Sequence, residues 1–146
     1  MNGLYFSRYS VRSNLLVDDP NDVILELKLF KEAGGGTVCD VSPPEVRIKP
    51  ELLPKLSKES GVHIVAGTAF YVDHLQSEES RTMSIREKAD VMVGQIVRGV
   101  GGSGMKCGLI GEIGCSWPLV DSERRSLQAA ALAQKETGEC VWICKS

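Results

Sequence analysis

An α/β domain with a parallel sheet is the architecture that this sequence indicates. Four segments with helical periodicity alternate along the chain with four short apolar runs. The runs do not alternate between polar and apolar residues, as half-exposed strands do. A continuous apolar run is typical of a parallel strand that is buried on both faces. Helices between such strands form right-handed crossovers, so the strands are expected to be parallel. The chain has 146 residues, which suffices for one domain.

The first predicted helix covers about Pro20 to Ala33. Asp19 is a suitable N-cap, and proline is favoured at the first helical position. The helix is expected to end at Gly34–Gly36, since glycine adopts the left-handed conformation without strain. Its apolar side chains recur at helical spacing, at Val23, Ile24, Leu27 and Phe30.

The second helix is predicted over about Pro50 to Glu59, with Gly61 closing it, and the third begins at Ser84. Ser84 and Glu87 have the spacing of a capping box, in which each side chain bonds a backbone N–H of the other residue. An apolar stripe follows the box and is expected to face the core. Its members are Ile85, Ala89, Met92, Val93, Ile96 and Val97.

The fourth helix is predicted over about Ser122 to Thr137, with Asp121 or Ser122 as its N-cap and Gly138 at its end. The apolar runs 36–41, 61–66, 105–113 and 140–144 are predicted as strands. Four such helix–strand units make either a complete flavodoxin-like domain or about half of a (β/α)₈ barrel, because a full barrel needs ~250 residues. Composition and periodicity leave both architectures open.

Charge and composition exclude several kinds of partner. The net charge of −2 provides no overall basic field that would attract nucleic acid. No apolar run reaches the ~20 residues of a membrane span, and the N-terminus lacks a secretory signal, so we expect no membrane partner and a cytoplasmic location. The five cysteines are scattered without a Cys-x-x-Cys pair, which favours free, buried thiols over disulfides.

Glu112 is the most conspicuous candidate for a functional role. It interrupts the apolar run Leu109–Gly114, and the carboxyl ends of parallel strands are where function collects in α/β proteins. A carboxylate in such a strand needs a cation, a metal or hydrogen-bond donors as partner. Glu112 is therefore either a ligand of a metal or substrate, or a structural ion-pair or exposed edge residue.

Three further side chains near strand ends are candidates for the lining of a pocket. Asp40 ends the first strand, where it is either catalytic or the cap of the following turn. Tyr71 follows the second strand and Trp117 follows the third. Of the two histidines, we expect His63 to be a buried core residue and His74 to lie on the surface.

Three stretches of the chain resemble the phosphotriesterase-related proteins of the amidohydrolase superfamily. They are residues 34–38, 60–73 and 108–119, and the third contains the specific string Gly-Glu-Ile-Gly-Cys-Ser-Trp-Pro. The resemblance covers roughly Asn14 to Gly138. It implies the family's (β/α)₈ TIM barrel, so that the chain is expected to form a partial barrel, about half of it, with barrel strands two to five and their helices.

The resemblance also implies a reaction. The family carries two divalent metal ions, typically zinc, at the carboxyl ends of the strands, and a hydroxide that bridges them attacks an ester or amide bond. Glu112 matches the bridging carboxylate of this centre. The family includes phosphotriesterases, lactonases and amidases, and animal members are linked to N-acetylated amino compounds such as N-acetyltaurine. The expected partner is thus a small-molecule ester or amide.

The chain also departs from the family pattern. It has no His-x-His, and Cys144 stands about where the family has a ligand histidine, so Glu112 alone of the six ligands is matched. We therefore expect residues 1–146 to be a single incomplete barrel domain, with an N-terminal segment 1–19 and a divergent or truncated end at 139–146. Such a chain is expected to be inactive as a hydrolase on its own.

An incomplete gene model, a splice product and a fragment all fit these departures. Unpaired sheet edges would favour self-association. Two alternatives to a hydrolase fragment remain open: a non-catalytic truncated product, and a small flavodoxin-like domain that binds a ligand.

Overall fold

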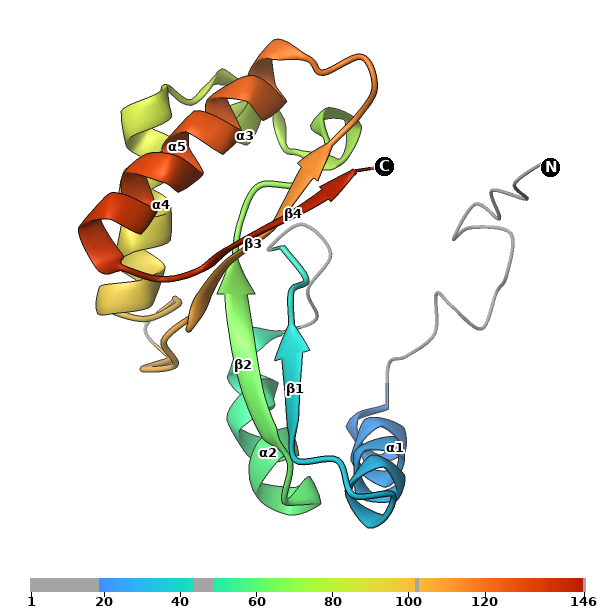
Figure 1. Ribbon diagram of the computed structural model, residues 1–146. Coiled ribbons are helices and arrows are strands. Elements are labelled where there is room, and N and C mark those ends of the chain that lie inside the picture. Colours follow the sequence, from blue (N-terminus) through green and yellow to red (C-terminus); the bar gives the residue numbers. More distant parts are fainter. Residues whose placement is uncertain (1–18, 44–48, 102, 146) are drawn as a thin grey trace, which may run out of the picture.

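The sheet has four parallel strands in the order β1-β2-β3-β4 (Figure 1). In the computed structural model, which describes residues 19–43, 49–101 and 103–145, the strands are Thr37–Asp40, His63–Thr68, Leu109–Cys115 and Val141–Lys145. Sequential order is that of a barrel segment, whereas a flavodoxin-like sheet places its second strand outside its first. The prediction of half a (β/α)₈ barrel is confirmed, and the flavodoxin-like alternative is wrong.

All four predicted helices are present. They are α1 (Pro20–Glu32), α2 (Leu53–Ser60) preceded by the 3₁₀ turn η2 (Pro50–Leu52), α4 (Ile85–Val97) and α5 (Asp121–Thr137). Two short elements between β2 and α4 were not predicted: η3 (Asp73–Leu75) and α3 (Glu78–Thr82). No helix in the described ranges is long and apolar enough to cross a membrane.

The helix ends explain why these segments fold locally. Asp19 caps α1 by accepting a hydrogen bond from the Asn21 backbone N–H at 2.8 Å. The predicted capping box is present at the start of α4, between Ser84 and Glu87. Each pairing satisfies a backbone donor that the first turn of a helix leaves free. Gly138 adopts the left-handed conformation at the end of α5, as expected.

The start of α5 differs from the prediction. Its N-cap residue is Val120, which provides no side-chain cap, whereas Asp121 and Ser122 already lie inside the helix. The Ser122 hydroxyl instead donates to the carboxylate of Asp73, in the segment that follows β2. A tertiary contact has therefore taken the hydroxyl that a local cap would have used.

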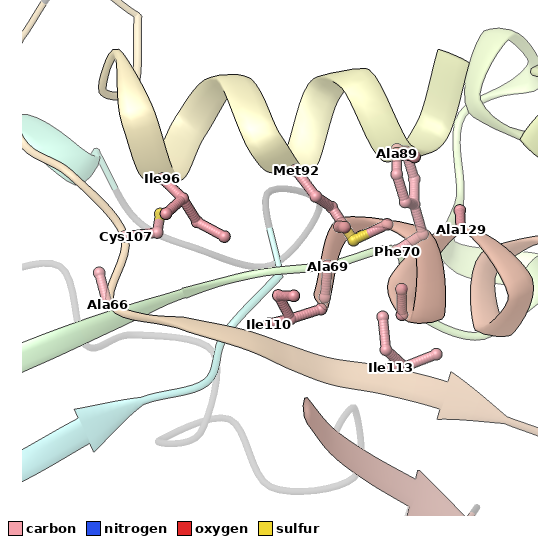
Figure 2. Packing of buried hydrophobic residues seen from close by; sticks show 12 residues of the cluster. Ala66, Ala69, Phe70, Ala89, Met92, Ile96, Cys107, Ile110, Ile113 and Ala129 are labelled. Carbon is pink, nitrogen blue, oxygen red and sulfur yellow. The ribbon is translucent and has the colours of Figure 1, made fainter. Parts of the chain in front are cut away.

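The hydrophobic core lies between β3 and the helices α4 and α5 (Figure 2). Ile110 and Ile113 of β3 and Met92 of α4 are fully buried there. Buried Lys88 of α4 is accommodated by polar and aromatic contacts: its Nζ donates to Gln76 Oε1 at 3.0 Å and lies 3.8 Å from the centroid of the Phe70 ring. The predicted stripe of α4 faces this core, except that Val97 at its end is exposed.

The opposite margin of the sheet is much less buried. Of the four apolar residues predicted along α1, only Ile24 is buried, and Phe30 is exposed. His63, which we expected in the core, is exposed as well. It is the first residue of β2 and pairs only with Thr37, whereas the buried half of β2 ends at Thr68, beside β3.

Residues 1–18 of the predicted N-terminal segment lie outside the described residues, so Asp19 is the one residue of that segment with a structure here. The C-terminal run predicted over 140–144 is a strand, β4. β1 and β4 are the two outer strands of the described sheet.

Candidate functional site

Glu112 lies in an irregular part of β3. The pairing of β3 with β4 is irregular between Ile110 and Ile113. Ile110 pairs with Val141 and Ile113 with Ile143, so β3 advances by three residues where β4 advances by two. Both isoleucines are buried against the helices, although side chains three residues apart in a regular strand point to opposite faces. The bulge absorbs this additional residue, so that both isoleucines join the core and Glu112 lies half-buried between them.

Glu112 and Cys144 lie close together on the sheet face away from the helices. Ile143 lines a groove against α5, so its neighbour Cys144 points to the other face of β4. Partial burial raises the pKa of the Cys144 thiol, and so do the negative charge of Glu112 and hydrogen bonding to its carboxylate. Among the described residues, no lysine or arginine forms an ion pair with Glu112, which leaves its structural ion-pair interpretation unsupported.

Asp40 is brought to the same end of the sheet. The backbone N–H of Glu112 donates to the carbonyl oxygen of Val41 at 2.8 Å, which ties β3 to the residue that follows Asp40. The Asp40 Oδ1 accepts from the backbone N–H of Ser42 at 3.0 Å. The aspartate therefore caps the turn after β1, as one of its two interpretations predicted.

Tyr71 and Trp117 occupy different surroundings near this edge. Tyr71 is half-buried, and a Cβ at Gly114 would collide with the backbone of the Tyr71–Val72 segment, so that segment runs directly against β3. Trp117 lies beyond β3 with 82% of its surface exposed. The Lys145 Nζ is 5.7 Å from the centroid of the indole ring, a cation–π contact at the end of β4.

One carboxylate that sequence reasoning missed organises this edge of the sheet. Glu123 in the first turn of α5 is fully buried. It accepts hydrogen bonds from the backbone N–H of Asp73 at 3.0 Å and from the Ser116 N–H and hydroxyl at 2.9 and 2.8 Å. Glu123 thus joins the segment after β2 to the segment after β3, both of which follow the carboxyl ends of strands.

The described residues do not fit a centre of two metal ions. No group of three or more histidine, cysteine, aspartate or glutamate side chains in the described ranges is arranged to hold a metal. His63 lies at the amino end of β2, away from Glu112, and His74 in η3 is exposed, as expected. Glu112 and Cys144 supply two donor groups, and the raised pKa of the thiol means that a metal would have to displace its proton.

Comparison with known proteins places the chain among a family of relatives. Residues 10–146 match the Phosphotriesterase family. The human N-acetyltaurine hydrolase is 42% identical over 142 residues, which cover 94% of this chain and 41% of the relative. The bovine N-acetyltaurine hydrolase is 45% identical over 131 residues, which cover 89% of this chain and 38% of the relative. The chain therefore spans about two fifths of the length of these relatives.

Solved structures agree in fold. A resiniferatoxin-binding protein from Rhodobacter sphaeroides superposes with a TM-score of 0.84 at 33% identity, covering 87% of this chain and 36% of its own. A phosphotriesterase homology protein from Escherichia coli, complexed with phosphate in its active site, superposes with a TM-score of 0.85 at 27% identity. The match covers 89% of this chain and 45% of that protein. Because the family match extends over almost the whole sequence, the chain belongs to the phosphotriesterase family.

Proposed function

We propose that this chain carries the Glu112 region of a metal-dependent hydrolase barrel that cleaves ester or amide bonds. Glu112 would be a carboxylate ligand in a centre of two divalent metal ions, with zinc as the expected metal. The observation that carries the proposal is its position: half-buried, on the sheet face away from the helices, and without an ion-pair partner in the described residues. A carboxylate so placed is a functional-site candidate, because burial without a cation is unfavourable.

The chain by itself is proposed to be inactive. Glu112 and Cys144 are two donors, and a binuclear centre needs more ligands than the described residues place around them. The contribution of this chain is then to position the Glu112 carboxylate, through the bulge of β3 and the hydrogen bond from its backbone to Val41.

The proposed substrate class is a small amide or ester. An N-acetylated amino compound is the first choice, because the human and bovine relatives are N-acetyltaurine hydrolases. A cytoplasmic location is part of the proposal, supported by the five cysteines, which are all free.

The first test measures zinc binding and hydrolysis by the 146-residue chain. After equilibration with zinc sulfate and removal of excess metal, we expect at most about one zinc ion per chain, because few donors converge. We expect no hydrolysis of N-acetyltaurine, an aryl ester or a lactone above the buffer rate. Glu112→Gln should lower the bound zinc, whereas Glu51→Gln, at an exposed position in η2, should not. Turnover that Glu112→Gln abolishes would contradict the proposed inactivity.

The second test asks whether the chain completes a hydrolase. The part of a curated relative that this chain does not span is produced separately and mixed with the chain and zinc. Hydrolysis that appears only in the mixture, and that disappears with Glu112→Gln but not with Glu51→Gln, is the expected result. A correctly associated but inactive mixture would instead favour the non-catalytic alternative.

A further inference from the structure

The segment that follows β1 reaches across β2 to the backbone of Glu112. Val41 comes directly after β1, and β2 lies between β1 and β3 in the sheet. The backbone N–H of Glu112 nevertheless donates to the Val41 carbonyl oxygen at 2.8 Å. In a regular sheet a strand bonds only to the strands beside it. The bulge of β3 therefore leaves the plane of the sheet at Glu112 and folds over β2.

Gly67 of β2 provides the space that this approach needs. A Cβ at Gly67 would collide with the carbonyl oxygen of Gly111, which belongs to the peptide group that ends at the Glu112 nitrogen. Ala66, the residue before Gly67, belongs to the core against the helices, so position 67 faces the other side of the sheet, where Glu112 lies. The peptide group before Glu112 is thus located at both ends, with its oxygen against Gly67 and its N–H on Val41.

Asp40 holds the other side of the same hydrogen bond. The Val41 carbonyl oxygen and the Ser42 N–H belong to one peptide group, and the Asp40 Oδ1 accepts from that N–H at 3.0 Å. A peptide group is planar, so fixing the direction of its N–H also fixes the direction of its carbonyl. Donation to a carboxylate also polarises the peptide group and makes its oxygen a better acceptor. The Asp40 carboxylate therefore acts on the carbonyl that receives the Glu112 N–H.

We propose that Asp40 is a positioning residue for Glu112, and that it acts through the Val41–Ser42 peptide group. It sets the direction of the carbonyl to which the Glu112 backbone is bound, and this backbone sets the position from which the half-buried carboxylate extends. The use of that carboxylate as a ligand rests on the proposed function, whereas the hydrogen bonds that place it do not. In this role Asp40 serves the site through the backbone and need not contact a reacting atom.

The test is nuclear magnetic resonance of the isotope-labelled 146-residue chain. In the wild type, a scalar coupling across the hydrogen bond, between the Glu112 nitrogen and the Val41 carbonyl carbon, reports the contact directly, and its absence overturns the proposal. Amide hydrogen exchange then measures how firmly the contact is held, as the ratio of the Glu112 rate to that of Ile110. The Ile110 N–H is hydrogen-bonded in the same strand, so the ratio removes any loss of stability that affects all of β3.

Variants of Asp40 separate geometry from charge. Asp40→Ala removes the acceptor, and Asp40→Glu keeps the charge but moves it by one methylene relative to the Ser42 N–H. Both should raise the ratio of the Glu112 rate to the Ile110 rate by about fivefold or more and weaken the coupling. Asp40→Asn keeps an acceptor oxygen in place and should change the ratio by less than about twofold. Asp19→Ala is the matched control and should leave the ratio unchanged, because it removes the same kind of hydrogen bond, to a backbone N–H two residues on, at the start of α1.

The outcomes that contradict the proposal are distinct. An unchanged ratio in Asp40→Ala or Asp40→Glu contradicts it, and so does an equally large rise in Asp40→Asn. A rise of that size in Asp19→Ala would assign the effect to a general loss of stability. If Asp40→Ala does not fold, Asp40→Glu and Asp40→Asn provide the comparison. Failure of the proposed function is a separate result: bound zinc that Glu112→Gln does not lower would remove the ligand role and leave the coupling and the exchange ratios as expected.

Discussion

Glu123 shows how much of this edge of the molecule depends on one side chain. Its two carboxylate oxygens accept from Asp73, which is 50 residues away in the chain, and from Ser116, which is seven away. Full burial makes each of these hydrogen bonds matter, because a buried donor that loses its acceptor costs about 1–3 kcal/mol.

Glu123→Gln is expected to destabilise the domain by about 2 kcal/mol, since the amide nitrogen would face a backbone or hydroxyl donor. Asp121→Asn is the matched control. It removes a negative charge from the same first turn of α5 but from an exposed position, so its cost should stay below about 1 kcal/mol. Urea denaturation of both variants measures the difference, and equal losses of stability would contradict the role assigned to Glu123.

A residue's role could be predicted only where the residue contrasts with the sequence around it or occupies a recognisable position at the end of an element. Glu112 is predicted as a ligand because a carboxylate interrupts an apolar strand, and this role stays a prediction, whereas the turn cap of Asp40 follows from its place at a strand end. Glu123 gave no such signal, because an acidic residue in the first turn of a helix is ordinary and its hydrogen-bond donors are set by tertiary structure. His63 was misjudged because the two residues that pair with β3 lie at the far end of β2.

At the scale of the element, α4 depends on its capping box. The Ser84 backbone N–H donates to the Glu87 carboxylate at 2.8 Å, and the Ser84 hydroxyl accepts from the Glu87 N–H. The hydrogen bond from the Ser84 backbone, followed by that from its hydroxyl, lowers the pKa of Glu87 from the usual 4.5. The ionised carboxylate is thus the form that the folded helix favours.

This pKa gives a sign to the pH dependence of stability. A carboxyl group with a lowered pKa in the folded state stabilises the fold above its unfolded pKa, and the contribution is lost as the pH falls through the folded pKa. We expect the stability advantage of the wild type over Glu87→Gln to be full at neutral pH, to decline as the pH falls below 4.5, and to be lost once the pH is below the lowered pKa of the folded state. Thermal melts of both proteins between neutral and acidic pH measure it, and a difference that is independent of pH would contradict it.

Element prediction succeeded where local chemistry marks the boundaries. Asp19, the capping box and Gly138 fixed three helix ends correctly. The short elements η3 and α3 were missed because five residues or fewer cannot display a helical period. The third strand was predicted from Met105 but begins at Leu109, since the backbone N–H of Cys107 donates to the carbonyl oxygen of Gln95 in α4 rather than to β2.

Across the whole molecule, burial is concentrated on one side. The connected core involves β3, α4 and α5, whereas β1 alternates between exposed and half-buried residues. The two sides are joined in the sheet by only two residue pairs between β2 and β3, Gly67 with Leu109 and Thr68 with Ile110. Local opening should therefore be easier on the β1 side, where fewer buried contacts must be lost.

We expect backbone amides of β3 and α5 to exchange with deuterium at least about tenfold more slowly than those of α1 and β1, which corresponds to a difference of about 1.4 kcal/mol in opening free energy. Hydrogen exchange followed by mass spectrometry resolves these segments, and the protein is kept at the lowest usable concentration so that association does not protect α1. Uniform protection across the sheet would contradict a core confined to one side.

The overall architecture was the least accessible to reasoning from single residues. Helix–strand alternation predicted parallel strands, yet the order in which they pair is not written in any local pattern. Two architectures therefore stayed open until the resemblance of residues 60–73 and 108–119 to the phosphotriesterase family favoured the barrel, and the sheet order confirmed it.

The bulge in β3 separates two demands on one strand. Because the bulge absorbs the additional residue between Ile110 and Ile113, both isoleucines face the helices, and Glu112 is not part of their core cluster. A substitution at position 112 should therefore leave the packing of the core against the helices intact. Deleting one residue between the two isoleucines would leave them two apart, the spacing at which a regular strand turns both to the same face, and would remove the irregular segment that carries the carboxylate.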